Sequence, residues 1–138
     1  MASRKIRLNI VTPKRILYDK EVDMVILRST EGDLGILSGH QEVTFALDFG
    51  LMRIDENGGD EIIAAVFGGF CEVTPNKITV LSDGAEWPDE IDEKRAEDAK
   101  ERAERRINSQ KHDINFYRAE LALKRALTRI EAVHFNKK

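Results

Sequence analysis

Residues 87–92 read Trp87-Pro88-Asp89-Glu90-Ile91-Asp92, and this stretch decides the fold because the hydrophobic pattern changes across it. Before it, apolar residues recur at every second position, as in Ile6-Arg7-Leu8-Asn9-Ile10, and all nine glycines lie between residues 32 and 84. After it, apolar residues recur every three or four positions and no glycine follows. A period of two predicts strands, whereas a period near 3.6 predicts helices. We therefore expect a β domain over residues 1–87 and a helical domain over residues 88–138.

The β domain contains short runs of β-branched and aromatic residues, separated by turn-forming residues such as Asn57-Gly58-Gly59. Roughly eight to ten such runs predict antiparallel strands that pack as a small sandwich or flattened barrel. Four of the runs lie close together in pairs, at residues 44–49 and 51–54 and at residues 62–67 and 70–73. We count the members of each pair as separate strands.

The helical domain reads as two antiparallel helices joined by a connector at residues 108–112. Asp92 is placed to cap the first helix and Asp113 the second, because a carboxylate can accept from the free N–H groups of a first turn. Apolar stripes predict the contact between the helices, and residues from His134 onward are expected to fray. The stripes comprise Ala96, Ala99, Ala103 and Ile107 on the first helix, and Phe116, Ala119, Leu123, Ala126, Ile130 and Val133 on the second.

Composition excludes several classes of protein. The net charge of −3 argues against a globally basic nucleic-acid binder, and no apolar run is long enough to enter a bilayer. The single cysteine, Cys71, excludes an internal disulfide, and the three histidines lack metal-ligand spacing, so we expect no metal site. No nucleophile motif or P-loop is present, which argues against an enzyme. These features predict a soluble cytosolic protein.

Arginines form a stripe on each predicted helix, Arg95, Arg102 and Arg106 on the first and Arg118, Arg125 and Arg129 on the second. At 100° per residue, the members of each stripe fall within about 40° of one another. Guanidinium groups in this arrangement suit polyphosphate oxygens. Spacing alone favours a solvated face whose arginines pair with acidic residues four positions away, as Asp98 and Arg102 could. Because alanine buries little area, the hairpin is expected to dock weakly and to be able to switch.

Five segments, in order and at the right spacing, resemble the epsilon subunit family of bacterial F-type (rotary) ATP synthases over essentially the full chain. Ser38 departs from the family, in which proline usually precedes Gly-His. The segments are Asn9-Ile10-Val11-Thr12-Pro13, Glu31-Gly32-Asp33-Leu34-Gly35-Ile36-Leu37-Ser38-Gly39-His40, Gly68-Gly69-Phe70-Cys71-Glu72-Val73, Ile91-Asp92-Glu93-Lys94-Arg95-Ala96 and Arg118-Ala119-Glu120-Leu121-Ala122-Leu123-Lys124-Arg125-Ala126.

This resemblance implies a ten-stranded antiparallel β-sandwich followed by an antiparallel two-helix hairpin. It implies a non-catalytic rotor subunit, peripheral at the cytoplasmic face of the bacterial cell membrane. The sandwich would bind the gamma subunit and the c-ring, and Asp33 and His40 match positions near the c-ring contact. The hairpin would permit ATP hydrolysis when folded, and would block the alpha and beta catalytic subunits when extended.

The resemblance also implies that ATP binds the folded hairpin as a regulatory ligand and is not hydrolysed there. Ile91, Asp92 and Ala96 would meet the adenine and ribose, and Glu86 would line the pocket. The phosphates would meet Arg95, Arg102, Arg118, Arg125 and Arg129. Two alternatives stay open: the same subunit without useful ATP affinity, and a stand-alone sandwich adaptor whose basic helices bind nucleic acid.

Overall fold

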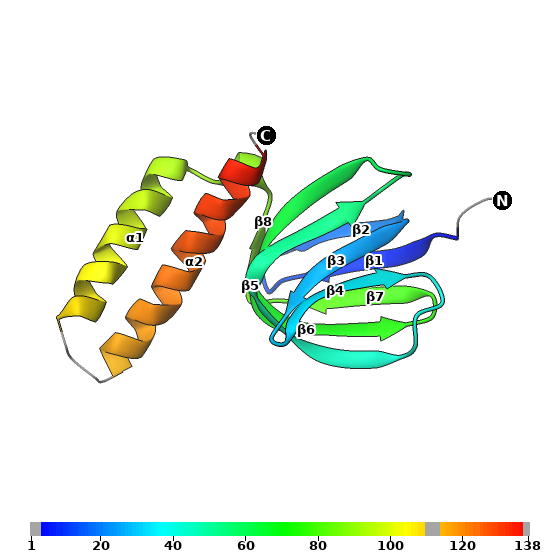
Figure 1. Cartoon of the computed structure of the whole chain (residues 1–138), viewed down its shortest axis with the longest axis horizontal. Helices are drawn as coiled ribbons and strands as arrows, with labels where there is room; N and C mark the ends of the chain where they lie inside the picture. Colours follow the sequence, from blue (N-terminus) through cyan, green and yellow to red (C-terminus); the bar gives the residue numbers. More distant parts are fainter. Residues whose placement is uncertain (1–3, 110–113, 137–138) are drawn as a thin grey trace. The chain divides into compact units, whose positions relative to one another are not determined.

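The computed structural model describes residues 4–109 and 114–136, and the chain divides into two compact units, Met1–Glu86 and Trp87–Lys138 (Figure 1). Within the described residues, the first unit contains only strands and the second only helices. The strands are β1 Ile6–Val11, β2 Ile16–Val22, β3 Met24–Ser29, β4 Gly32–Leu37, β5 Val43–Asp55, β6 Glu61–Thr74, β7 Lys77–Leu81 and β8 Ala85–Glu86. The helices are η1 Pro88–Glu90, α1 Glu93–Asn108 and α2 Ile114–Asn136.

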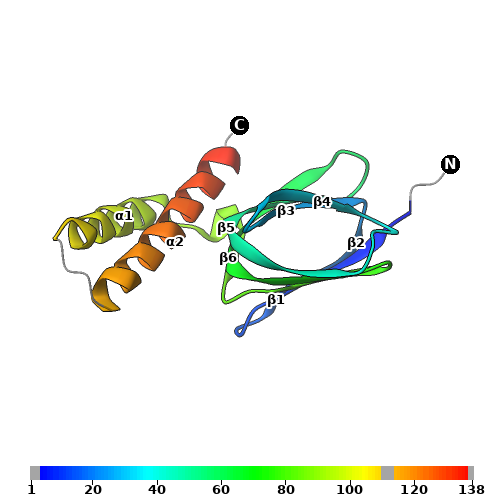
Figure 2. The same ribbon diagram turned by 60° about the horizontal axis from the view of Figure 1, so that its bottom comes forward.

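The strands of the first unit form one hydrogen-bonded sheet in the order β2-β1-β7-β6-β5-β3-β4, with β8 paired to β6. The sheet folds over so that its strands lie in two layers (Figure 2), as the predicted sandwich requires. Alternate residues point between the layers, so that Ile6, Leu8 and Ile10 are fully buried on β1 and Ile78 and Val80 on β7. The period of two in the sequence therefore comes from one buried face per strand.

The predicted count of ten strands is wrong for the described residues, which form eight. The two pairs of neighbouring runs each make one long strand, β5 with 13 residues and β6 with 14. Gly68 and Gly69 in β6 have φ angles of 74° and 112°. These angles bend the strand without ending it, because only glycine adopts them without strain. On one side of the bend, Ala65 and Val66 of β6 pair with β8, and on the other side residues 70–74 pair with β7. β5 pairs with β6 on both sides of the bend.

The prediction that all strands are antiparallel is also wrong for one pair. β1 and β7 are parallel, with Arg7 opposite Lys77 and Val11 opposite Leu81, whereas every other pairing among the described strands is antiparallel. The alternating pattern within a strand cannot predict whether two strands pair parallel or antiparallel, because that depends on which distant strands become neighbours. Parallel neighbours need a long crossover connection, and strands β2 to β6 supply it here.

The glycine-containing segment that resembles the family at residues 31–40 includes a strand. Residues 32–37 make β4, which pairs with β3 across a tight turn closed by Ser29, whose Oγ donates to the carbonyl of Gly32 over 2.7 Å. The two residues that match family positions near the c-ring contact lie toward opposite ends of β4. Asp33 lies near its beginning, and His40 follows its end.

The helices of the second unit begin where the sequence predicts. Pro88 opens η1, and the Glu90 carboxylate accepts from the backbone N–H of Trp87 over 2.9 Å. Asp92 caps α1, since its Oδ1 accepts from the backbone N–H of Arg95 over 3.1 Å. The predicted cap Asp113 lies outside the described residues. Neither helix combines the length and apolar composition that crossing a membrane requires, within the part of the chain that is described.

Small side chains form the seam between α1 and α2. Ala96 and Ala103 are buried on α1, and Ala119, Ala126 and Val133 are buried on α2. The remaining residues of the predicted stripes are half-buried at its margins. The prediction that the chain frays from His134 is wrong for residues 134–136, which complete α2. His134 Nε2 lies 2.7 Å from Oε2 of Glu93, so the last turn of α2 is tied to the first turn of α1.

Candidate functional site

The residues predicted to meet ATP are distributed over both units. Glu86 ends β8 in the first unit, whereas the other eight lie in the second. Ile91 and Asp92 precede α1, and Arg95, Ala96 and Arg102 lie on it. α2 contributes Arg118, Arg125 and Arg129. The hairpin is therefore the part of the site whose geometry can be described from its own residues.

The two arginine stripes lie on the same side of the hairpin. Around the axis of α1, the arginine stripe lies about 80–120° from the buried seam residues Ala96 and Ala103. Around the axis of α2, its arginine stripe lies at the same angle, and in the same sense, from Ala119 and Ala126. When two helices pack antiparallel with their seams facing, equal rotations bring the two stripes to one side. We call this surface the arginine side; it comprises Arg95, Arg102, Arg106, Arg118, Arg125 and Arg129.

A shallow depression on the arginine side joins the two helices at one end. It has a volume of about 440 Å³ and is lined by Arg106, Ser109, Asn115, Phe116 and Arg118. Ligand pockets commonly measure about 300–1,000 Å³. The family resemblance did not include Arg106 among the ATP-binding positions, although the stripe in the sequence contains it. The depression therefore adds Arg106 to the candidate residues.

The antiparallel packing separates the candidate residues along the hairpin. The contact between Glu93 and His134 places Arg129 near the beginning of α1, with Arg95. Arg102 and Arg125 follow in the middle, and Arg118 lies at the far end with Arg106. Asp92 and Arg106 are separated by about 21 Å at a rise of ~1.5 Å per residue. Arg118 is therefore remote from the Ile91–Ala96 end, where the base was expected.

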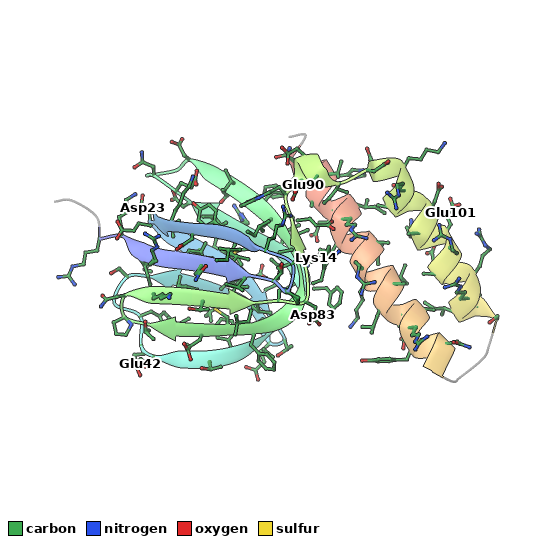
Figure 3. All side chains as sticks on the ribbon, turned by 180° about the vertical axis from the view of Figure 1, so that it is seen from behind. Lys14, Asp23, Glu42, Asp83, Glu90 and Glu101 are labelled. Carbon is green, nitrogen blue, oxygen red and sulfur yellow. The ribbon has the colours of Figure 1, made fainter. Side chains whose placement is uncertain are left out.

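Five of the six arginines on this side form no ion pair with the acidic residues that the structure describes. Among the described residues, the guanidinium groups of Arg95, Arg102, Arg106, Arg118 and Arg125 form no ion pair or hydrogen bond. Glu101, four positions before Arg105, lies on the face of α1 turned away from α2 (Figure 3). These five arginines thus place positive charge in two rows without ion-pair partners among the described residues. Such a surface is suited to bind an anion that carries more than one charge.

Two of the predicted residues already have structural roles within the hairpin. The Asp92 carboxylate is engaged as the cap of α1, and Ala96 is 4% exposed within the seam. Ala96 therefore contributes mainly the close approach of the helices. Arg95 and Arg102 are exposed, and Arg125 and Arg129 are half-buried at the edge of the seam.

Asp33 and His40, which match family positions near the c-ring contact, do not form one cluster. Asp33 lies on β4 opposite Arg28 of β3, and its Oδ1 is 3.6 Å from Nε of that arginine. His40 lies beyond the other end of β4, where its Nδ1 is 2.9 Å from the carbonyl oxygen of Gln41. Residues 33–37 alone span about 13 Å of extended strand. Any shared partner would have to contact both ends of β4.

An exposed apolar row crosses the sheet of the first unit and was not apparent from the sequence. We call it the apolar strip; successive strand registers connect Ala46, Phe70, Leu81, Val11 and Ile16. Phe70, Leu81 and Ile16 are 60%, 52% and 64% exposed. Contiguous apolar surface of this kind marks protein interaction sites. The sequence could not reveal it, because the strip forms only when five strands align in this register.

The one cysteine is not a candidate nucleophile. Cys71 is fully buried on β6, and burial raises the pKa of its thiol to about 12. The thiol therefore stays protonated at neutral pH, whereas the thiolate is the reactive form of cysteine. The hydroxyl of Tyr18 donates to the Glu56 carboxylate, and burial followed by this hydrogen bond raises the pKa of Tyr18. Both groups belong to the sandwich and not to the arginine side.

A β-sandwich unit followed by a separate antiparallel helical hairpin is the architecture of one class of rotary-enzyme subunits. Two family models match, the ATP synthase delta/epsilon chain β-sandwich domain over residues 5–88 and its long α-helix domain over residues 89–134. The chain therefore belongs to the delta/epsilon chain family of ATP synthases.

The curated relatives of this chain carry a more specific name. The protein named ATP synthase epsilon chain from Bacillus velezensis is 44% identical over 128 residues, which are 93% of this chain and 96% of the relative. The protein of the same name from Desulforamulus reducens is 45% identical over 126 residues, 91% and 95% of the two chains.

A solved structure has the same fold. A chain of the Euglena gracilis mitochondrial ATP synthase, solved as OSCP/F1/c-ring in rotational state 1, matches with a TM-score of 0.80 and 22% identity. The match covers 97% of this chain and 82% of that one.

Proposed function

We propose that this chain is the epsilon subunit in the central stalk of an F-type ATP synthase, and that it regulates the enzyme without being catalytic. The proposal is supported by the bacterial relatives named ATP synthase epsilon chain. In this function the sandwich attaches to the gamma subunit and the c-ring, and the hairpin acts as a switch. The subunit is peripheral and works at the cytoplasmic face of the bacterial cell membrane.

The hairpin binds ATP as a regulatory ligand on its arginine side. The observation that supports this most directly is the set of guanidinium groups that form no ion pairs with the described residues, arranged in two rows on one side. A polyphosphate in contact with both rows would bridge α1 and α2. It would therefore stabilise only the state in which the helices lie side by side.

An ATP titration of the full-length chain tests this site. We expect saturable binding, with and without Mg²⁺, detected by isothermal titration and by Trp87 fluorescence. Arg102→Ala and Arg125→Ala should each weaken binding by about tenfold or more, since a charge-assisted hydrogen bond contributes about 1.5–3 kcal/mol. Arg105→Ala is the matched control, because Arg105 is exposed on the same helix but lies opposite the seam.

Two results would contradict the ATP site. The first is no saturable change at millimolar ATP, which would leave the subunit without useful ATP sensing. The second is an equal loss in Arg105→Ala and Arg102→Ala, which would indicate general charge attraction instead of a defined site.

The hairpin inhibits hydrolysis when its helices separate and extend toward the alpha and beta subunits. The alanine seam supports this, because a contact made by Ala96, Ala103, Ala119 and Ala126 buries little area and opens at small cost. A chain that ends at Glu86 should retain assembly and raise the ATPase activity of the reconstituted complex. Unchanged activity after this truncation would contradict the inhibitory role.

The apolar strip is the surface that we assign to the gamma subunit. Phe70 of β6 pairs with Leu81 of β7. Both are large apolar side chains that are exposed near the centre of the strip. The double variant Phe70→Glu/Leu81→Glu should fold but lose copurification with gamma. Leu127→Glu is the control, since it adds a charge at a position of similar exposure, 45%, on the helical unit. Retained copurification in the double variant would exclude the strip.

The c-ring contact is assigned to the two ends of β4. Asp33→Ala and His40→Ala should each weaken binding to the c-ring while leaving binding to gamma intact. If both variants bound the assembled c-ring normally, this assignment would fail and the contact would lie elsewhere on the sandwich.

A further inference from the structure

The side of the hairpin opposite the arginines carries a different cluster. Glu93 and Glu97 of α1 and His134 of α2 place one ligand atom each within 4.8 Å of the other two. The closest of these contacts joins His134 Nε2 and Glu93 Oε2 at 2.7 Å. We call these three residues the Glu–Glu–His cluster. It is the cluster with metal-ligating side chains from both helices among the described residues.

Helix geometry explains why the three side chains converge. Glu93 and Glu97 are four residues apart, so they lie on one face of α1, about 60–100° from the alanine seam and away from the arginines. His134 is rotated by about 60° from the seam of α2 in the corresponding sense. Antiparallel packing then brings the last turn of α2 beside the first turn of α1.

The cluster combines one Glu–His contact with a second carboxylate beside it. Glu97 has no hydrogen bond or ion pair with any described residue, although its carboxylate lies close to that of Glu93. Two adjacent carboxylates with one imidazole make a site that attracts a divalent cation.

We propose that Glu93, Glu97 and His134 bind a divalent transition metal ion of the Zn²⁺ type, which links the two ends of the hairpin. Carboxylate oxygen and imidazole nitrogen are both zinc ligands, and such ligand atoms lie about 2.0–2.2 Å from the metal. The three ligand atoms of the cluster lie within 4.8 Å of one another, so a small closing movement of the side chains would bring them around one ion. Ca²⁺ and Mg²⁺ prefer oxygen ligands, so the imidazole favours the transition metal.

The site consists of residues from both helices, so it is complete only while the hairpin is closed. The metal ion therefore favours the closed state, by the same linkage as any ligand that binds one state alone. That consequence for regulation rests on the proposed function, whereas metal binding itself does not. A Zn²⁺ titration and an ATP titration are separate measurements, so either proposal can fail without the other.

Zn²⁺ titration of the metal-free full-length chain tests the proposal. We expect one saturable site by isothermal titration, and with Co²⁺ as the probe a visible absorption band. His134→Gln and Glu97→Gln should each weaken Zn²⁺ binding by at least ~10-fold and abolish the Co²⁺ band. His40→Gln is the matched control, since His40 belongs to the sandwich, and it should bind as the wild type does.

A second measurement reports on the closed hairpin. Saturating Zn²⁺ should raise the melting temperature of the helical circular dichroism signal in the wild type and not in His134→Gln. The proposal is overturned if no saturable binding occurs up to millimolar Zn²⁺, or if His134→Gln and Glu97→Gln bind with wild-type affinity. It is also overturned if His40→Gln is the variant that loses the site.

Discussion

Gly69 lies in the middle of β6 and has no room for a side chain. Its φ angle is 112°, and a Cβ atom at this position would be 2.1 Å from the carbonyl oxygen of Leu81 and 2.8 Å from Cα of Ser82. Both obstacles are backbone atoms, which cannot rotate away as a side chain could. The bend of β6 and its close approach to the end of β7 therefore depend on this one glycine.

Gly69→Ala should lower the free energy of unfolding of the sandwich by at least ~2 kcal/mol, because strained φ and a backbone clash add together. Gly35→Ala is the matched control: it also replaces a strand glycine, but its Cβ would have nothing within 4 Å and its φ is not positive. Urea denaturation followed by strand circular dichroism measures both. Equal stability of the two variants would show that the bend does not require glycine.

The buried thiol of Cys71 makes the folded sandwich less stable at alkaline pH. Its thiol has a pKa of about 12 in the folded chain against an ordinary value of 9.0. Between these values the unfolded chain has lost the proton and the folded chain keeps it, so stability falls as pH rises. The fall from this group is about 1.4 kcal/mol per pH unit. Tyr18, whose pKa is also raised, acts in the same direction at higher pH.

We expect Cys71→Ala to lose stability less steeply than the wild type between pH 9 and pH 10, whatever its stability at neutral pH. Denaturant titrations at several pH values measure the two slopes. Identical slopes would mean that the buried thiol does not retain its proton in the folded chain.

At the scale of elements, the seam of the hairpin depends on small side chains. Ala103 is 2% exposed and Ala126 is 1% exposed, so both side chains are buried within the hairpin. A larger residue would push the helices apart, and overpacking of this kind costs about 1–3 kcal/mol. In the proposed ATP site, close approach of the helices also keeps the two arginine rows within reach of one ligand.

Ala103→Leu should therefore lower the melting temperature of the helical signal and weaken ATP binding, even though leucine is a good helix former. Leu127→Ala, which changes a 45% exposed residue, should affect neither. Thermal circular dichroism and the ATP titration supply the two readouts. A stabilised hairpin in Ala103→Leu would show that the seam has spare room.

The sequence predicts the elements better than their connections. The Asp92 cap and the alanine seam follow from local patterns, and the structure confirms them. The merging of four runs into β5 and β6 depends on backbone angles at Gly68 and Gly69 that no pattern of hydrophobicity encodes. The parallel pair β1–β7 and the apolar strip depend on which distant strands become neighbours.

The candidate sites divide in the same way. The arginine stripes could be read from helical spacing, because three arginines on one helix define a face. The Glu–Glu–His cluster could not, because Glu93 and His134 are 41 residues apart and meet only when the hairpin closes. Local spacing therefore finds sites within one element and misses those assembled from two.

At the scale of the whole molecule, the two units differ in what holds them together. All eight described strands and the large buried side chains, such as Ile6, Leu8, Leu27 and Ile54, belong to Met1–Glu86. The second unit buries mainly alanine. The free energy of folding is therefore concentrated in the sandwich.

A fragment of residues 1–86 should fold with a cooperative urea transition and strand-type circular dichroism. A fragment of residues 87–138 should be largely unfolded at 25 °C, because short helices with little buried area are marginal in water. Circular dichroism and urea titration of the two fragments provide the check. A stable, cooperative hairpin fragment would contradict the weak seam.

The lengths of the helices determine how far the subunit could reach. α2 has 23 residues, and the closed hairpin is therefore about 35 Å long. Glu93 to Asn136 as one continuous helix would be about 66 Å long. Opening the hairpin would thus nearly double the distance over which its end can act. That change is large enough for a pair of fluorescent labels to follow it as a change in energy transfer, without any measurement of enzyme activity.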